Sequence, residues 1–398
     1  MIEIIEGQYT IKQIFQDNRN WERFKEKYGA QLRPNIIAEV KKMLACRDPL
    51  QLGYHMYVCK ECGLVERIVP HSCKSRFCSS CGKVMVDQWI ERSMSGFVDV
   101  PYHHIVFTIP AELRNIFRWD RTQLGILFTA AQRTLLDWCQ SQGFTPGIVA
   151  VMHTFGSDLK WNPHIHVLIT EGGLSLNRTR WITNEFIPWA MLKERWKFHV
   201  VNLLRPRLKD MIRGLRVSWE YLSLGTGKPF AGFWNVLYLK TWYVWMGRKL
   251  DNARFTAQYI GRYTKRPVLA QSRIKEYDGK YVTFEYEDKT EERRLPLRMT
   301  VEEFIARLVV HIHDKHFRAI RHYGFYATRT RKEDIALART LLNEAAKPEV
   351  IPMNWQQRRR RSTGYDPLVC HRCNVPLTLV AVAYRSRDGP LVERTFDN

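Results

Sequence analysis

The sequence lacks several features that would place it in common protein classes. It has no run of roughly 18 apolar residues, the length that a membrane-spanning helix needs. Its first residues show no basic patch followed by an apolar stretch, so no secretory signal is predicted. Internal repeats, low-complexity segments and the G-x-x-x-x-G-K-[S/T] phosphate-binding pattern are also missing. These absences argue against a membrane, secreted or ATP-hydrolysing protein, and a cytoplasmic location is expected.

Acidic residues are few relative to basic ones. Lys and Arg number 62 against 40 Asp and Glu, which gives a formal net charge of +22. Such an excess favours a polyanionic partner, because phosphate contacts release counterions, and nucleic acid is the usual one. The alternative is a basic protein kept soluble by its charge. Basic and aromatic residues alternate at Lys240, Trp242, Tyr243, Trp245 and Arg248, a pattern that fits base stacking or simple core packing.

The chain is longer than a typical single domain, so several units are expected. The patterns suggest four consecutive segments. They are a helical segment (1–52), a zinc-binding domain (53–95), a catalytic domain (96–328) and a basic C-terminal region (329–398).

Local patterns predict the main helices and strands. Residues 10–29 have helical spacing, with Thr10 as N-cap and Gly29 as the end. Alternating β-branched sequence predicts strands at 103–110, 147–156 and 164–170. A further strand is expected at 279–288, in a hairpin with the residues before it. Other helices are predicted at 84–92, 122–140, 186–213, 251–264 and from the N-cap Thr300 onward.

Nine cysteines in a chain without a secretion signal indicate metal binding rather than disulfides. Cys59 and Cys62 form one C-x-x-C pair, and Cys78 and Cys81 form another, with residues 63–77 between them. This spacing is typical of two knuckles that wrap four thiolates around one structural Zn²⁺. The alternative is a group of buried free thiols. A zinc ribbon over 53–82 is therefore expected, in which the basic residues would face DNA.

Other candidate ligands surround these pairs. Cys73 and His71 lie between the two pairs, and one zinc ion with Cys73 as a bystander is the simpler expectation. Cys370 and Cys373 form a third C-x-x-C with no partner pair downstream, so metal binding there, with or without His371, is less strongly indicated than buried thiols.

The segment WNPHIHVLIT places His164 and His166 two residues apart in a predicted strand. Residues i and i+2 of a strand point to the same face, so both imidazoles can bind one divalent cation. His153, on the preceding predicted strand, is a tentative third ligand, and a histidine satisfied within the core is the equal alternative. Asp158 and Gln258 are other candidates.

Tyr259 and Tyr263 lie four residues apart in AQYIGRYTKRP, so they share one face of the predicted helix. Taken alone, such a pair is usually part of a packed core. Here it occurs together with the two histidines, the cysteine pairs and the strong positive charge.

This combination resembles the HUH transposases of the insertion sequence 91 family. The resemblance extends from the cysteine pairs through the blocks HHIVFTIP, NPHIHVLI, YIGRYTKR, KYVTFEYED, MTVEEFIARLVVHI and FRAIRHYGFYA. It implies an α+β fold, in which an HUH nuclease domain has a central antiparallel sheet flanked by helices, joined to an N-terminal zinc-ribbon-like domain and helical extensions.

The resemblance also implies residue roles. His164 and His166 match the HUH motif that binds catalytic Mg²⁺ or Mn²⁺, and Tyr259 and Tyr263 match the two nucleophiles of two-tyrosine members. The expected activity is cleavage and rejoining of single-stranded DNA at element ends and target DNA through a 5′-phosphotyrosine, in rolling-circle transposition with the host replication machinery. A bacterial protein associated with the nucleoid is expected. Phosphate contacts are predicted for Arg262, Lys265, Arg266, Arg318 and Arg321.

Three alternatives share some of these features. A plasmid replication initiator or relaxase of the HUH class would use the same nucleophile chemistry. A zinc-dependent DNA-binding protein without catalysis would keep the cysteines and the basic surface. RNA binding through the zinc-binding and basic segments is a third possibility.

Overall fold

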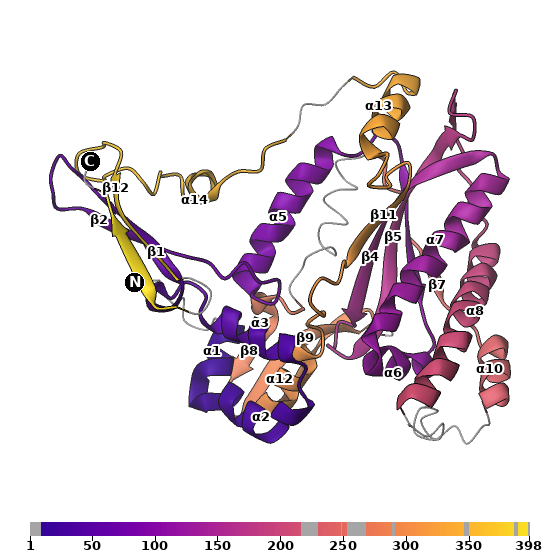
Figure 1. The fold of residues 1–398 in the computed structure, drawn as a ribbon, viewed down its shortest axis with the longest axis horizontal. Helices are drawn as coiled ribbons and strands as arrows, with labels where there is room; N and C mark the ends of the chain where they lie inside the picture. Colours follow the sequence, from indigo (N-terminus) through magenta and orange to yellow (C-terminus); the bar gives the residue numbers. More distant parts are fainter. Residues whose placement is uncertain are drawn as a thin grey trace. The chain divides into compact units, whose positions relative to one another are not determined.

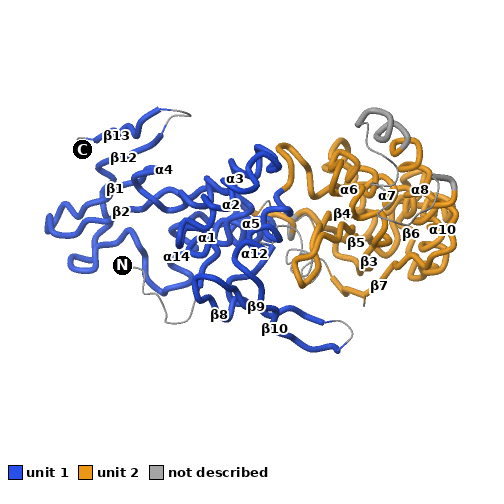
Figure 2. Tube along the Cα trace, turned by 90° about the horizontal axis from the view of Figure 1, so that it is seen from below, with its two compact units in different colours: residues 1–91, 265–312, 351–398 blue, residues 92–264, 313–350 orange. Residues whose placement is uncertain are grey.

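The computed structural model describes residues 9–215, 230–247, 249–252, 268–288, 291–345, 350–385 and 389–396. Over these ranges, no helix has both the length and the apolar character needed to cross a membrane. The chain forms two compact units, and neither is continuous in sequence (Figure 2). Unit 1 comprises residues 1–91, 265–312 and 351–398, and unit 2 comprises 92–264 and 313–350. Each compact unit is thus assembled from segments that are not consecutive in the sequence.

Unit 2 is built on an antiparallel sheet with strand order β11-β4-β5-β3-β7. A short strand, β6, pairs with the far end of β5. The three strands predicted first are present, and β4 and β5 are longer than expected. The strands are β3 (Tyr102–Thr108), β4 (Phe144–Phe155), β5 (Trp161–Ser175), β6 (Trp181–Ile182), β7 (Val244–Met246) and β11 (Ile320–Gly324).

Helices flank this sheet (Figure 1). Helix α7 carries a continuous apolar side, including the fully buried Leu127, Phe128 and Leu135, and α8 buries Trp196. Trp196 also donates a hydrogen bond from Nε1 to the carbonyl oxygen of Thr108 at the end of β3 (2.7 Å). The helices of unit 2 are α6 (Ala111–Trp119), η3 (Arg121–Gln123), α7 (Leu124–Ser141), α8 (Trp189–Leu215), α10 (Phe230–Leu239) and α13 (Arg331–Leu341). The predicted α+β class with a central antiparallel sheet flanked by helices is confirmed.

The N-terminal part of unit 1 is helical. The single helix expected over 10–29 is interrupted, because Asn18 and Arg19 adopt positive φ angles of 47° and 55°. Thr10 caps the first helix as predicted, and Gly29 follows the end of the second. The elements are α1 (Ile11–Gln16), η1 (Asp17–Arg19), α2 (Asn20–Tyr28), η2 (Gly29–Gln31), α3 (Pro34–Leu44), α4 (Pro49–Leu52) and α5 (Ser79–Ser95), whose last residues belong to unit 2.

Unit 1 also contains two antiparallel sheets. One has the order β10-β9-β8, and the predicted hairpin of β8 with β9 is present. Helix α12 follows it and is capped by Thr300, whose hydroxyl accepts from the Glu303 amide (3.1 Å). These elements are η4 (Gln271–Arg273), β8 (Ile274–Tyr277), β9 (Tyr281–Asp288), β10 (Arg293–Thr300) and α12 (Val301–Val309).

The second sheet of unit 1 joins segments far apart in the sequence. Its order is β13-β12-β1-β2, so β1 pairs on one side with the neighbouring β2 and on the other with β12 near the C-terminus (Figure 1). The β12 and β13 strands were not expected in the charged C-terminal region. The elements are β1 (Gly53–Val58), β2 (Glu66–Pro70), α14 (Trp355–Thr363), β12 (Thr378–Arg385) and β13 (Leu391–Thr395).

A buried pair of phenols stabilises the sheet of unit 2. The hydroxyls of Tyr102 and Tyr326 are 2.5 Å apart, Tyr102 also donates to the carbonyl oxygen of Val98 (2.9 Å), and the Val98 amide donates to Tyr326 (3.1 Å). Tyr102→Phe would leave buried polar groups without a partner, at a cost of about 1–3 kcal/mol. We therefore expect amide hydrogen exchange in β3 to accelerate by roughly 5- to 150-fold, measured by mass spectrometry.

The exposed Tyr365, in unit 1, offers a matched control. Tyr365→Phe removes a hydroxyl without breaking buried hydrogen bonds, so amide hydrogen exchange in β3 should keep its wild-type rate. An unchanged β3 exchange rate in Tyr102→Phe would show that the phenol pair contributes nothing to local stability.

Candidate functional site

Three histidines meet where β4 and β5 pair. His153 on β4 lies directly opposite His164 on β5, and His166 is two residues further along β5. The ligand nitrogens of the three rings lie within 4.8 Å of one another. His153 and His166 are buried. The structure therefore brings the tentative third residue together with the two histidines of the H-x-H motif.

Hydrogen bonds fix how two of these rings face each other. The Nδ1 of His164 lies 2.7 Å from the carbonyl oxygen of Asn162, so that nitrogen carries the proton and donates it. Its Nε2 is then the unprotonated nitrogen of the neutral ring, and this atom lies 3.0 Å from the Nε2 of His166. Adjacent ligands of an octahedral cation at roughly 2.1 Å are about 3.0 Å apart, so the two rings fit a divalent ion.

A fourth histidine, which sequence reasoning missed, orients His166. His104 lies on β3, and its Nε2 is 2.9 Å from the Nδ1 of His166, with the two rings stacked. Burial, followed by the charge of His153, lowers the pKa of His104 to about 4, so this ring is neutral at pH 7. A neutral His104 can accept the Nδ1 proton of His166 and thereby direct the Nε2 of His166 toward the histidine cluster. The signal in the sequence was the histidine pair that opens HHIVFTIP.

Arg321, which was predicted to contact phosphate, lies on β11 and points away from these rings. Arg321 pairs with Ala150, and the neighbouring Ile320 pairs with Val151, which in turn lies opposite His166. Successive residues point to opposite faces, so Arg321 lies on the other face of the sheet from His166. Its guanidinium is 4.3 Å from the centre of the Phe128 ring of α7. Arg318, just before β11, is exposed.

The exposed Trp245 lies on the same face of the sheet as His166. Trp245 of β7 pairs with Val106, which lies opposite His166 on β5. Its ring meets the His104 ring edge-on at 5.4 Å, and 52% of its surface is exposed. The alternating basic and aromatic stripe is thus divided, because Trp242 is buried in the core while Tyr243 and Trp245 are exposed.

Several predicted site residues are not in the cluster or are not described. Asp158, in the turn between β4 and β5, pairs with Lys160 (3.1 Å) and is not one of the three residues in the histidine group. The remaining candidates, Gln258, Tyr259, Arg262, Tyr263, Lys265 and Arg266, lie outside the described residues.

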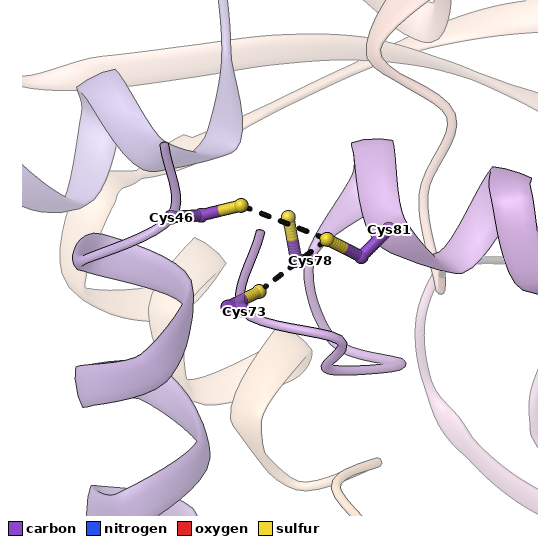
Figure 3. A group of neighbouring side chains, drawn as sticks. All are labelled: Cys46, Cys73, Cys78 and Cys81. Carbon is purple, nitrogen blue, oxygen red and sulfur yellow. Dashed lines mark hydrogen bonds between the residues drawn. The ribbon is translucent and has the colours of Figure 1, made fainter. Parts of the chain in front are cut away.

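A group of four cysteines lies in unit 1 (Figure 3). Cys46 follows α3, Cys73 and Cys78 lie in the loop after β2, and Cys81 lies in the first turn of α5. The Sγ atoms of Cys46 and Cys73 are each 3.6 Å from that of Cys81. Tetrahedral Zn–S bonds of about 2.3 Å place sulfurs about 3.8 Å apart, so the group fits one zinc ion.

The protonation of these thiols shows why a cation belongs there. Hydrogen bonds with Cys46, Cys73 and Cys78 lower the pKa of Cys81. Hydrogen bonds with Cys46, Cys78 and Cys81 raise the pKa of Cys73. One sulfur can therefore take a negative charge only while its neighbours keep their protons. Four thiolates this close together need a positive ion at their centre.

The expected single zinc site of Cys59, Cys62, Cys78 and Cys81 is wrong in its pairing. Cys59 and Cys62 instead lie with Cys370 and Cys373, which form the other group of four cysteines among the described residues. The reason is that β12 pairs with β1 and carries the C-terminal pair to the first knuckle.

The residues between the knuckles are also reassigned. Cys73, expected as a bystander, is part of the group with Cys78 and Cys81, and Cys46 had not been considered. His71 belongs to neither group, because its Nδ1 lies 3.0 Å from the carbonyl oxygen of Leu52 and its Nε2 lies 2.9 Å from Nδ1 of His55.

Comparison with known proteins places these sites in context. Residues 147–334 match a family described as a putative transposase, and residues 16–109 match a transposase zinc-binding domain. The second match contains the whole quartet of Cys46, Cys73, Cys78 and Cys81, which supports Zn²⁺ as its ion. No solved structure matches the chain significantly.

Two curated relatives match along almost their whole length. The transposase for insertion sequence element IS801 of Pseudomonas savastanoi pv. phaseolicola is 30% identical over 383 residues, covering 93% of this chain and 89% of the relative. A putative transposase of Sinorhizobium fredii is 27% identical over 384 residues, covering 92% and 95%. The chain therefore belongs to the insertion sequence 91 family of transposases and is a DNA-cleaving enzyme of the IS801 type.

Proposed function

We propose that this transposase cuts and rejoins single-stranded DNA at the ends of its element through a tyrosine-linked intermediate. The observation that supports this most directly is the meeting of His153, His164 and His166 on one face of the sheet. The Nε2 atoms of His164 and His166 lie 3.0 Å apart, and His153 is close enough to share one cation with them. A cation next to the scissile phosphate would promote phosphodiester cleavage. The match to a putative transposase family spans these histidines and the two tyrosines.

The three histidines would hold Mg²⁺ or Mn²⁺. When bound, the ion would polarise the scissile phosphate and stabilise negative charge in the transition state. Imidazole ligands suit Mn²⁺ better than Mg²⁺, which prefers oxygen ligands. His104 would not contact DNA or the ion; it would hold the ring of His166 in the required orientation.

Tyr259 or Tyr263 would supply the nucleophile. The phenol has an ordinary pKa of about 10, so it loses its proton as it attacks. A bond forms between the tyrosine Oη and the phosphorus, the bond from phosphorus to the 3′ oxygen breaks, and that oxygen leaves as a 3′-OH after taking up a proton. The product is a 5′-phosphotyrosine, which keeps the energy of the phosphodiester, so rejoining needs no ATP.

Two tyrosines permit two linkages in succession. One tyrosine would cut the donor end and the other would take up a second strand of the target. The free 3′-OH can prime synthesis by the host replication machinery, which corresponds to rolling-circle transposition. Arg262, Lys265, Arg266 and Arg318 would contact phosphates near the cut, and Trp245, exposed beside His104, is placed to stack on an unpaired base. Such a protein would work at the nucleoid.

Arg321 is a weaker candidate for a phosphate contact than sequence analysis suggested. Its guanidinium lies over the Phe128 ring, on the opposite face of the sheet from the histidines. We propose that it stabilises the packing of α7 on β11 and does not contact the cleaved strand.

The covalent intermediate is directly testable. Purified protein is mixed with single strands that tile the ends of its element, each labelled at either end, with Mn²⁺ or Mg²⁺. We expect a protein–DNA band that survives denaturation, needs the metal and carries the label of the 3′ end, because the tyrosine holds the 5′ phosphate of the fragment downstream of the cut. It should vanish in the Tyr259→Phe/Tyr263→Phe double variant, and the single variants should show which tyrosine acts first.

Tyr365→Phe, at an exposed position far along the chain, is the control and should form the band normally. A band that persists in the double variant would move the nucleophile elsewhere. Folded, zinc-loaded protein that forms no band on any strand would instead favour DNA binding without strand transfer.

The role of His104 predicts a metal-affinity defect. His104→Ala should raise the Mn²⁺ concentration needed for half-maximal nicking by roughly 10- to 100-fold, because His166 loses the partner that orients it. Saturating Mn²⁺ should restore most of the rate. The matched control is His103→Ala, whose ring faces Glu171 instead of the cluster (3.9 Å) and which should keep the wild-type Mn²⁺ dependence. A rate defect in His104→Ala that saturating metal does not restore would contradict a positioning role.

A further inference from the structure

The second cysteine quartet combines two ends of the chain. Cys59 and Cys62 follow β1, and Cys370 and Cys373 precede β12. The ligand sulfurs of all four lie within 4.8 Å of one another, and the Sγ atoms of Cys62 and Cys370 are 3.9 Å apart across 308 positions of sequence. This S···S separation matches the value of about 3.8 Å expected around a tetrahedral Zn²⁺.

The two C-x-x-C turns are built in the same way. In the first, the Cys59 amide donates to the carbonyl oxygen of Val65 (2.9 Å), and in the second the Cys370 amide donates to that of Val375 (2.8 Å). Each turn also closes with a bond to the carbonyl oxygen of its first cysteine, from Gly63 in one turn (3.0 Å) and from Asn374 in the other (2.9 Å). Two turns of the same construction therefore present their sulfurs to one point.

The residue after each second cysteine has the same unusual backbone. Gly63 has φ of 62° and Asn374 has φ of 56°. Glycine and asparagine are the residues that adopt this left-handed conformation most readily. In the second turn the Cys373 amide points at the Sγ of Cys370 (3.4 Å), an arrangement that stabilises a thiolate. The backbone of both turns is thus shaped to hold metal-bound sulfurs.

Little apolar material supports this part of the molecule. Cys59 and Cys370 are almost completely buried, and they form a small cluster with Val65 and Leu377. The strands around it are mostly half-buried, and β13 is largely exposed. A sheet with so small a core depends on a cross-link or a metal for its stability.

We propose that Cys59, Cys62, Cys370 and Cys373 bind a second structural Zn²⁺, which completes a zinc ribbon assembled from the two ends of the chain. The β1–β2 hairpin contributes one knuckle, and the segment that leads into β12 contributes the other. This site is separate from the quartet that contains Cys46, and it does not depend on the proposed strand-transfer chemistry. The protein then carries two thiolate-bound zinc ions per chain.

The second zinc ion also fixes an arginine-rich helix in place. Asp366, four residues before the knuckle, accepts from the side chain of Gln356 in α14 (2.9 Å) and from the Leu368 amide (2.9 Å). On the other side of α14, Arg358 pairs with Glu91 of α5 (2.9 Å). The three arginines that follow, Arg359, Arg360 and Arg361, are exposed. The zinc ion therefore holds a compact positive charge on unit 1, which suits a phosphate backbone.

Zinc counting tests the proposal. Full-length protein is treated briefly with a chelator to clear histidine-bound metal, and thiolate-bound zinc is then released with a mercurial thiol reagent and measured colorimetrically. We expect two zinc ions per wild-type chain, one in Cys370→Ser/Cys373→Ser and one in Cys73→Ser/Cys78→Ser. Cys139→Ala, which removes a buried thiol of α7 outside both quartets, should retain two. One zinc in the wild type, or two in Cys370→Ser/Cys373→Ser, would overturn the proposal.

A second measurement guards against variants that fail to fold. Cys62 and Cys373 are only partly buried, so alkylation of wild-type protein can be followed at each by mass spectrometry. Both should resist alkylation in zinc-loaded protein and become reactive together when strong chelation removes zinc. Alkylation of Cys62 and Cys373 without zinc release would refute the site even if the serine variants lose all of their metal.

Discussion

The antiparallel pairing of β4 with β5 is the constraint on which the histidine cluster of unit 2 depends. Its register places His153 opposite His164, and strand alternation brings His166 to the same face. A slip of β5 by one residue would turn His164 and His166 to the opposite face of the sheet, into the core that Ile165 now occupies. The side chains of α7 and α8 cover the other face and make such a slip costly. The grouping of the three histidines is thus a consequence of sheet register, and the third strand, β3, places His104 within hydrogen-bond distance of His166.

Much of unit 2 could be predicted because its signals are local. Alternating β-branched residues identified three strands, and H-x-H identified two rings on one face. His153 could be named only tentatively, since its role depends on which strands are neighbours. His104 was missed because its adjacent residue, His103, has the same side chain and points the other way, toward Glu171. One sequence cannot distinguish the two until the register of β3 against β5 is known. Arg321 illustrates the same limit, because alternation directs it to Phe128.

The cysteines show a different limit. Cys59-x-x-Cys62 and Cys78-x-x-Cys81 were predicted as knuckles, because the turn that brings the two sulfurs of such a pair together is short and local, whereas Cys370 and Cys373 were expected to be buried thiols. The partner of each knuckle was assigned wrongly, because the pairing of β1 with β12 is a long-range contact that no spacing rule contains. Cys46 is a single residue at the end of α3 with no motif around it. It joins Cys73, Cys78 and Cys81 only because the chain returns to α3 after the β1–β2 hairpin.

The entropy of loop closure explains why the spacing between C-x-x-C pairs does not determine which pairs share a zinc ion. Closing the residues 63–77 between neighbouring knuckles costs less than closing the 308 positions between Cys62 and Cys370, but the cost grows only with the logarithm of length. The longer loop corresponds to about four or five doublings of the length of the shorter one. The extra entropic cost of closing it is therefore roughly 2–3 kcal/mol. Structural zinc binding by thiolates supplies about 10–16 kcal/mol in small peptides, so either pairing is affordable in energy. The contacts around the cysteines then determine which C-x-x-C pairs come together. The β1–β12 ladder and the small cluster of Val65 and Leu377 favour the distant pair, and they commit the C-terminus to the N-terminal half of the same unit.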